Sequence, residues 1–345
     1  MSTCTYATKG LCVLPHGDTS PCCVINGDNL KPYTSFSQFY NDPAFTEVRK
    51  FNTDKNVLES VWCDVCKYSE KANHISLRKR SFDNPIEDNT DEVKLRLLDI
   101  SFGNTCNLDC VMCCSAYSSK WASTHGKIPE VANITGHDTS AKSNTLSYAH
   151  IDELLENSVD LERVIIKGGE PLYDKKALYF IERLHNYNPN ANLNMVTNLT
   201  MLTDKKLDML KQYKHINVIT SCDGIGQVYE WIRGWSWDKL EANINRCIEQ
   251  GIKLSVQITI TAYNIGNLEA WYQHYNSKNI KTNFIFANEP WLHYSNVGKT
   301  KLADIIENLT APVTVELQDP KDIVAFQDYT NIMNKQRGFN WQDIC

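Results

Sequence analysis

From about residue 93 onward, the chain alternates between short apolar runs typical of β-strands and longer amphipathic patterns typical of helices. We expect strands at 93–103, 164–169, 192–200, 216–224, 253–263 and 281–287. We expect helices between them at 147–158, 175–187, 202–213, 237–251 and 268–278. Repeated strand–helix units indicate a parallel sheet with right-handed crossovers. Six units are too few to close an eight-stranded barrel. The pattern therefore predicts an α/β fold with an open, partial (β/α)6 TIM-like barrel over residues 93–290.

Two further segments flank this predicted barrel. Residues 1–92 are irregular and rich in Gly and Pro, with one short helix expected around 36–51. Because so little periodicity calls for another source of stability, such as a metal centre, we expect a small irregular cysteine-rich N-terminal domain here. Residues 291–345 carry two helical patterns and are expected to form a helical extension that packs on the barrel.

Charge and hydropathy narrow the choice of partner and location. The formal net charge of −6 disfavours a protein that binds duplex nucleic acid through its phosphate backbone. The sequence has no run of 18 apolar residues, so no membrane span is expected. The N-terminal residues lack the charged and then apolar pattern of a secretory signal. We therefore expect a cytoplasmic protein.

Thirteen cysteines are unusual in a cytoplasmic chain, where clustered thiols indicate metal binding or catalysis rather than disulfides. The densest group follows the first predicted strand, in GNTCNLDCVMCCS (103–115). Cys106, Cys110 and Cys113 have the spacing CX3CX2C, and soft thiolates select iron–sulfur clusters or zinc. A structural site would use four ligands, whereas three leave one position open for an outside ligand. Cys114 adjoins Cys113, and we do not expect both to bind one cluster.

This loop resembles that of the radical S-adenosylmethionine (radical SAM) enzymes, in which CX3CX2C follows the first strand of a partial (β/α)6 barrel. The resemblance implies a [4Fe–4S] cluster held by Cys106, Cys110 and Cys113. It also implies that the open iron binds the amino and carboxylate groups of S-adenosylmethionine (SAM). Met112 stands where the family usually has an aromatic residue, and its apolar side chain is expected to pack near the adenine.

A second motif extends the resemblance after the second predicted strand. The family's GGEP motif, which meets the methionine amino group of SAM, is similar to Gly168, Gly169, Glu170 and Pro171. The residue types suit this role, because glycines let the backbone approach a ligand closely and Glu170 supplies charge.

Residues after the later strands resemble other parts of the SAM pocket. Thr197 and Asn198 are similar to the family's TN motif, which lies near the site. Ser221 belongs to a stretch that looks like the S-x-DG of the peptide-modifying branch, which implies contact with the ribose or carboxylate of SAM. Arg233 matches an arginine that pairs with the SAM carboxylate, a charge-assisted contact. Thr259 resembles the ribose and adenine side of the pocket.

The N-terminal cysteines permit two interpretations. Taken alone, two cysteine pairs separated by roughly 40 residues are typical of a zinc ribbon. The segment also resembles the SPASM/twitch cluster domains of radical SAM enzymes, although those usually follow the barrel. That resemblance implies one auxiliary [4Fe–4S] cluster held by Cys12, Cys22, Cys63 and Cys66, with Cys23 competing with Cys22. The interval between Cys12 and the glycine before PCC is shorter than in that family. With four thiolate ligands, the implied role is electron transfer.

Together these resemblances imply an enzyme that cleaves SAM reductively to a 5′-deoxyadenosyl radical and abstracts hydrogen from a substrate C–H bond. A peptide or amino-acid side chain is the first expected substrate, because SPASM/twitch relatives often modify peptides. A nucleotide or other small metabolite is the alternative, and a zinc-stabilised binding protein without catalysis is a third. Asp223, at the end of the fourth predicted strand, is expected to act on the substrate or position it. A flavodoxin or ferredoxin is the expected electron donor.

Overall fold

The computed structural model describes residues 4–25, 30–53, 61–71, 75–83, 86, 94–136 and 146–344. The chain divides into two compact units, each described here by itself. Unit 1 comprises Met1–Asn104, Lys142–Met195 and Asp208–Ile216, and unit 2 comprises Thr105–Ala141, Val196–Leu207 and Asn217–Cys345. Within the described ranges, no helix combines the length and apolar character needed to cross a membrane.

Unit 1 begins with helix α1 (Thr5–Lys9) and three short strands, β1 (Gly10–Val13), β2 (Asp18–Ser20) and β3 (Lys31–Pro32). Neighbouring strands in this group pair antiparallel. Gly17 has φ 92° in the turn between β1 and β2, a conformation that favours glycine. β1 also pairs in parallel with β4 (Leu97–Ser101), which places Cys12 opposite Asp99. The N-terminal segment therefore shares a sheet with the first predicted barrel strand.

The single helix expected around residues 36–51 is interrupted. α2 (Phe36–Asn41) begins at Ser35, whose hydroxyl accepts a hydrogen bond from the backbone N–H of Gln38 over 3.2 Å. Asp42 is extended, with ψ 126°, because the residue before a proline avoids the helical conformation. The chain resumes as α3 (Pro43–Thr53). Helices α4 (Asp64–Lys71) and α5 (Leu77–Asp83) follow.

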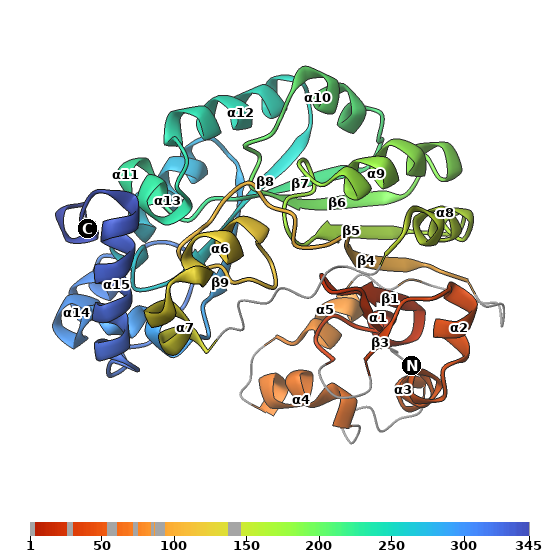
Figure 1. Cartoon of the computed structure of the whole chain (residues 1–345), viewed down its shortest axis with the longest axis horizontal. Helices are drawn as coiled ribbons and strands as arrows, with labels where there is room; N and C mark the ends of the chain where they lie inside the picture. The colour runs from red at the N-terminus through yellow and green to blue at the C-terminus, as the bar shows by residue number, and fades with distance from the viewer. Residues whose placement is uncertain are drawn as a thin grey trace. The chain divides into compact units, whose positions relative to one another are not determined.

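The parallel part of unit 1 consists of β4, β5 (Arg163–Lys167) and residues 192–195 of β6 (Asn192–Thr197), whose last two residues belong to unit 2. The strand order in this unit is β3-β2-β1-β4-β5-β6. Helices α8 (Tyr148–Glu156) and α9 (Lys175–Tyr187) connect the parallel strands and lie along one side of them (Figure 1). These are the strand–helix units that the sequence pattern predicts.

The two faces of β4 and β5 differ in character. The face toward the helices carries the fully buried side chains Leu98, Ile100, Val164 and Ile166. Phe102 continues this face, and its ring centroid lies 5.3 Å from that of Phe180 in α9. Because side chains alternate along a strand, Asp99 and Lys167 lie on the opposite face. The Nζ of Lys167 donates to Asp99 Oδ2 over 2.8 Å, so that face carries an ion pair in which the carboxylate is buried and the lysine half-buried.

Unit 2 contains the parallel strands β7 (Ile216–Ser221), β8 (Lys253–Ile260) and β9 (Lys281–Phe286), in that order. Its connecting helices are α11 (Gly226–Arg233), α12 (Trp237–Glu249) and α13 (Leu268–Ser277), while α10 (Asp204–Lys211) precedes β7. α12 packs on β8 and α13 on β9. The remaining helices are α6 (Ser119–Ser123), α7 (Pro129–Thr135), α14 (Lys299–Glu307) and α15 (Ile323–Arg337).

An aromatic core holds α15 against the rest of unit 2. Its buried rings include Trp121, Trp231, Tyr263, Phe326, Tyr329 and Trp341. α15 also packs on α7, beside which it lies in Figure 1. Tyr329 donates its hydroxyl hydrogen to the backbone oxygen of Val111 over 2.5 Å. The C-terminal helix is therefore bonded directly to the cysteine loop that contains Val111.

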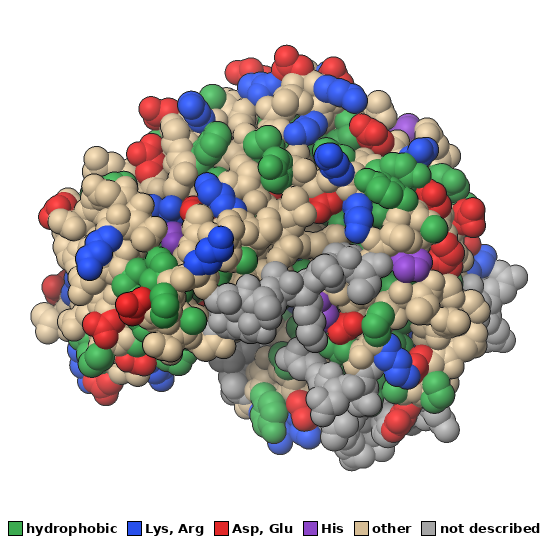
Figure 2. Space-filling view, in the orientation of Figure 1, with side chains coloured by type: hydrophobic (Ala, Val, Ile, Leu, Met, Phe, Trp, Pro, Cys, Tyr) green, Lys and Arg blue, Asp and Glu red, His purple; other side chains and the backbone are tan. Residues whose placement is uncertain are grey.

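The predicted fold class is confirmed. All the expected strands are present as β4 to β9, helices alternate with them, and the sheet is open. The first is shorter than expected, at Leu97–Ser101, and residue 93 lies outside the described residues. The division into residues 1–92, 93–290 and 291–345 stays a prediction. Figure 2 shows acidic and basic side chains interspersed over the described surface of the face in view.

Candidate cofactor site

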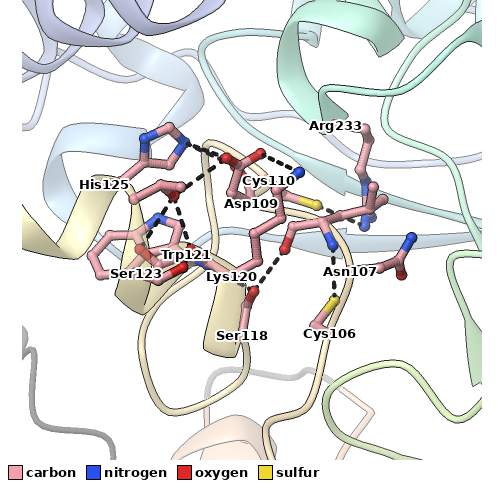
Figure 3. Close-up of polar contacts among 12 residues, drawn as sticks. Cys106, Asn107, Asp109, Cys110, Ser118, Lys120, Trp121, Ser123, His125 and Arg233 are labelled. Carbon is pink, nitrogen blue, oxygen red and sulfur yellow. Dashed lines mark hydrogen bonds and ion pairs between the residues drawn. The ribbon is translucent and has the colours of Figure 1, made fainter. Parts of the chain in front are cut away.

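The cysteine loop of unit 2 runs from Cys106 to Cys114 as turns and irregular backbone (Figure 3). Ser118 anchors it, because its hydroxyl donates to the backbone oxygen of Leu108 over 2.6 Å and accepts from the N–H of Trp121 at the start of α6. The N–H of Cys113 donates to the backbone oxygen of Cys110 over 3.0 Å. The Ser118 hydroxyl thus links the loop, which has no regular secondary structure, to the start of α6.

Nitrogen donors point at two of the predicted cluster ligands. The Sγ of Cys106 accepts from the backbone N–H of Leu108 over 3.5 Å and from Asn198 Nδ2 over 3.9 Å. The Sγ of Cys110 accepts from Arg233 Nη1 over 3.4 Å (Figure 3). Such donors stabilise a thiolate and tune the potential of a cluster bound to it.

The other thiols of the loop oppose the ionisation of Cys113. Burial raises the pKa of Cys113 well above its usual value, and the negative charges of Cys110, Cys114 and Cys106 raise it further. In the described part of the chain, no three His, Cys, Asp or Glu side chains are gathered closely enough to hold a single metal ion. Cys106, Cys110 and Cys113 suit a cubane instead, whose larger inorganic core takes thiolates at separate irons and offsets their charge.

Asp223 and Arg233 form a buried ion pair beside this loop. Asp223 is fully buried, and its Oδ2 accepts from the guanidinium of Arg233. Its Oδ1 accepts from the N–H of Thr259 over 2.7 Å. Burial raises the pKa of Asp223, against the opposing effect of the Arg233 charge. Both carboxylate oxygens are engaged within the chain, so Asp223 ties the end of α11 to β8.

Of the predicted TN residues, Asn198 contacts the cysteine loop at Asn107 as well as at Cys106. Asn107 is not among the residues predicted from the sequence. Asn198 Nδ2 donates to Asn107 Oδ1 over 3.0 Å. Asn107 Nδ2 in turn donates to the hydroxyl of Thr200 over 2.8 Å. Thr197 accepts the N–H of Leu199 on its hydroxyl over 2.9 Å. Asn107 directly follows the predicted ligand Cys106 in the sequence, and this adjacency could have identified it as a site residue.

Three further predicted residues belong to unit 2, namely Ser221, Thr259 and Met112. Ser221 is the last residue of β7, two positions before Asp223. Thr259 is bonded to Asp223 as described above, and Met112 packs against the aromatic core. The structure thus brings Arg233, Asp223 and Thr259 together at the ends of two neighbouring strands.

The GGEP residues belong to unit 1 and form a tight turn after β5. Gly168 has φ 106°, and a Cβ there would lie 2.8 Å from the Cβ of Ser101, so only glycine fits. The N–H of Gly169 donates to the backbone oxygen of Gly103 over 3.0 Å. Glu170 and Pro171 are buried, and Glu170 Oε1 accepts from the N–H of Leu172 over 2.9 Å. The turn is therefore held close to the end of β4.

The predicted N-terminal ligands, Cys12, Cys22, Cys63 and Cys66, all belong to unit 1. Cys4 and Cys22 share a buried cluster with apolar side chains, against which Trp62 packs. Burial raises the pKa of Cys4, and the charge of Cys66 raises it further. Cys63 ends a short 3-10 helix, Val61–Cys63, immediately before α4, which carries Cys66. Cys4 is not among the ligands predicted from the sequence.

Cys12 and Cys23 face another group. Burial raises the pKa of Cys12 well above its usual value, and the charge of Asp99 adds to this effect. Cys23 accepts a hydrogen bond from Cys22, which lowers its pKa, and it also lies near Lys167 and Asp99. The two adjacent thiols are thus hydrogen-bonded to each other. Cys22 also lies in the apolar cluster with Cys4, and Cys23 also lies near Lys167 and Asp99. The short interval between Cys12 and Gly17 was the signal that could have favoured Cys4.

Comparison with known families decides the class of the protein. The family model of the Radical SAM superfamily matches residues 100–277, just over half of the chain. The chain belongs to the radical SAM superfamily. It is therefore a radical SAM enzyme, and the family implies SAM and a [4Fe–4S] cluster as cofactors. The resemblance stated from the sequence is confirmed in these respects.

The curated relatives include GTP 3′,8-cyclases. That of Campylobacter jejuni subsp. doylei is 23% identical over 245 residues, which cover 68% of this chain and 71% of the relative. That of Thermodesulfovibrio yellowstonii is 32% identical over 126 residues, covering 35% of this chain and 33% of the relative.

Two solved structures are also similar. anSMEcpe with bound AdoMet has a TM-score of 0.46 at 16% identity, covering 62% of this chain. The present chain spans 57% of that chain. SuiB of Streptococcus suis has a TM-score of 0.44 at 12% identity, covering 96% of this chain and 69% of that chain.

Proposed function

We propose that Cys106, Cys110 and Cys113 hold the SAM-binding [4Fe–4S] cluster of this radical SAM enzyme. The observation that carries this proposal is the Arg233–Cys110 contact of 3.4 Å, beside the Cys113 thiol, whose ionisation the charges of Cys110 and Cys106 oppose. When bound, such a cluster supplies an electron that splits SAM into methionine and a 5′-deoxyadenosyl radical. The chain's own task is to fix SAM, bring the substrate close and exclude water.

Several residues would fix SAM. We assign the turn of Gly168, Gly169, Glu170 and Pro171 to its amino group, and the guanidinium of Arg233 to its carboxylate. Ser221, Thr259 and Met112 would line the ribose and adenine. For Asp223 we propose a positioning role, because both of its oxygens are already bonded to Arg233 and Thr259.

We further propose an auxiliary [4Fe–4S] cluster in unit 1, held by Cys4, Cys22, Cys63 and Cys66. We propose Cys4 in place of Cys12 because Cys4 shares a buried cluster with Cys22, whereas Cys12 lies opposite Asp99 in the sheet. Zinc, the other occupant considered from the sequence, also takes four thiolates. The described side chains are, however, not gathered closely enough to hold a single metal ion. An all-thiolate cluster would accept an electron from a substrate radical.

For the substrate we propose a peptide or amino-acid side chain, supported by the likeness of the N-terminal cysteines to SPASM/twitch domains. A nucleotide is the second candidate, favoured by the GTP 3′,8-cyclase relatives, which align with 68% of this chain. A flavodoxin or ferredoxin would supply electrons, and we place the protein in the cytoplasm because its thiols require a reducing compartment.

The test is chemical analysis followed by turnover. After anaerobic reconstitution, about 8 irons per chain with matching sulfide supports two cubanes, whereas about 4 irons with one zinc supports a structural zinc site in unit 1. Dithionite and SAM should then yield 5′-deoxyadenosine, and a Cys113→Ala chain should yield none. Iron-loaded wild type that forms no 5′-deoxyadenosine would contradict the proposed function. Deuterium transfer from labelled peptides or from labelled GTP separates the two substrate classes.

A further inference from the structure

Arg337, the last residue of α15, is bonded to two segments of unit 2 that lie far from it in sequence. Its side chain is only 9% exposed. Nη1 donates to Asp109 Oδ1 over 3.0 Å and Nη2 to the backbone oxygen of Asp109 over 2.7 Å. On the other side, Nε donates to the backbone oxygen of Trp231 over 2.8 Å. The planar fork of a guanidinium is suited to joining several acceptors in a fixed geometry.

Both segments lead directly to the cluster contact. Asp109 immediately precedes Cys110, and Trp231 lies two positions before Arg233. The same segments are bonded to each other, since the N–H of Val111 donates to the backbone oxygen of Ile232 over 2.8 Å. Arg337 therefore bonds to both backbone segments, at Asp109 and at Trp231, that carry Cys110 and Arg233 and so set the contact between Cys110 Sγ and Arg233 Nη1.

We propose that Arg337 is a positioning residue that fixes the Cys110 thiolate against Arg233, and thereby the SAM-binding geometry. The proposal rests on the proposed function, because it assumes a cluster at Cys110. Arg337 is bonded to Asp109 and to the backbone of α11, and to none of the three proposed cluster ligands. It therefore acts through the backbone and the Asp109 carboxylate. The loop cysteines have little regular structure to hold them, so a side chain from a distant helix supplies the missing constraint.

The residues around Arg337 leave space for its guanidinium and hold its partner Asp109 in place. Gly234 has φ 66°, and a Cβ at this position would lie 2.7 Å from Arg337 Nη1. Asp109 is held by other partners as well: Thr124 donates its hydroxyl to Oδ2 over 3.2 Å, and His125 Nε2 lies 2.9 Å from the backbone oxygen (Figure 3). α15 is anchored independently, because Trp231 Nε1 donates to Asn334 Oδ1 over 3.1 Å. The helix can thus stay in place when the guanidinium is removed.

The test compares Arg337→Met and Arg337→Lys with the wild type, as full-length, anaerobically reconstituted protein. Lys335→Met is the matched control, because Lys335 lies on the same helix with an exposed side chain. Iron content, SAM dissociation constant and the electron paramagnetic resonance spectrum of the reduced cluster are measured for each. We expect iron content to be retained, SAM binding to weaken about tenfold in both Arg337 variants, and the SAM-induced spectral change to shrink. The control should match the wild type.

The two variants separate positioning from simple stabilisation. Arg337→Lys keeps the charge opposite Asp109 but cannot form the fork, so it should fold well and still bind SAM weakly. Arg337 variants that bind SAM with wild-type affinity and give the wild-type spectrum would overturn the proposal, even if their melting temperature falls. A wild-type chain that takes up iron but binds no SAM would overturn the proposed function, and this inference with it.

Discussion

Arg233 donates from Nη1 to the Sγ of Cys110 over 3.4 Å while its guanidinium is paired with the buried carboxylate of Asp223. One cation thus lies between a carboxylate and a sulfur of the predicted cluster. The charge of Asp223 raises the pKa of Arg233 in spite of burial, so the guanidinium stays charged.

Replacing Asp223 with Asn should strongly destabilise the protein. It leaves a buried guanidinium without its anion, and breaking a buried pair in this way costs about 3–5 kcal/mol. The measurement is the free energy of unfolding from urea titration. Asp204→Asn is the control, because Asp204 is 94% exposed in its pair with Arg246 and should contribute less than about 1 kcal/mol. Equal losses in the two variants would show that the Asp223 pair behaves like a surface pair.

Replacing Cys4 or Cys12 with Ser should have different effects on iron content. Cys4→Ser removes a proposed ligand and should lower the reconstituted iron by about four atoms per chain. Cys12→Ser should leave it unchanged, since Cys12 lies beside Asp99 instead. Cys247→Ser, in α12, controls for loss of a buried thiol as such. Iron loss in Cys12→Ser but not in Cys4→Ser would restore the ligand set expected from the sequence.

Replacing Gly168 with Ala should destabilise unit 1 and weaken SAM binding. The new Cβ would lie 2.8 Å from Ser101 Cβ at φ 106°, which combines strain and overlap and costs about 2–4 kcal/mol. Gly226→Ala is the control. Gly226 has φ 56° with nothing within 4 Å of its Cβ, so only about 1 kcal/mol of backbone strain is expected. Thermal unfolding of both variants would be compared, and equal shifts would contradict the steric argument.

The sequence predicted the local features of this protein well. Hydrophobic period and turn residues are encoded within short windows, so β4 to β9 and most connecting helices were found. The break at Pro43 was missed although its signal was present in the sequence. The pairing of β1 with β4 was missed for another reason: parallel pairing joins segments distant in the chain, and a four-residue strand gives little signal.

The candidate site was predictable only where motifs mark it. Cys106, Cys110 and Cys113 stand in a recognisable spacing, and Arg233 was assigned from its match to the family. Asn107 and Asp109 lie within the same loop but have no pattern that distinguishes them from other polar loop residues. Arg337 is 228 positions from Asp109, and nothing in the sequence near either residue indicates their contact.

The parallel pairing of β1 with β4 also bears on how the protein folds. Cys22, Cys63 and Cys66 all lie in the chain between these two strands. Pairing β1 with β4 therefore closes a long loop, and closing that loop costs chain entropy. A metal centre held by those cysteines together with Cys4 would cross-link the loop before the strands pair. The two strands would then find each other faster during folding. Refolding of the N-terminal segment should then run faster when iron and sulfide are supplied than when they are withheld.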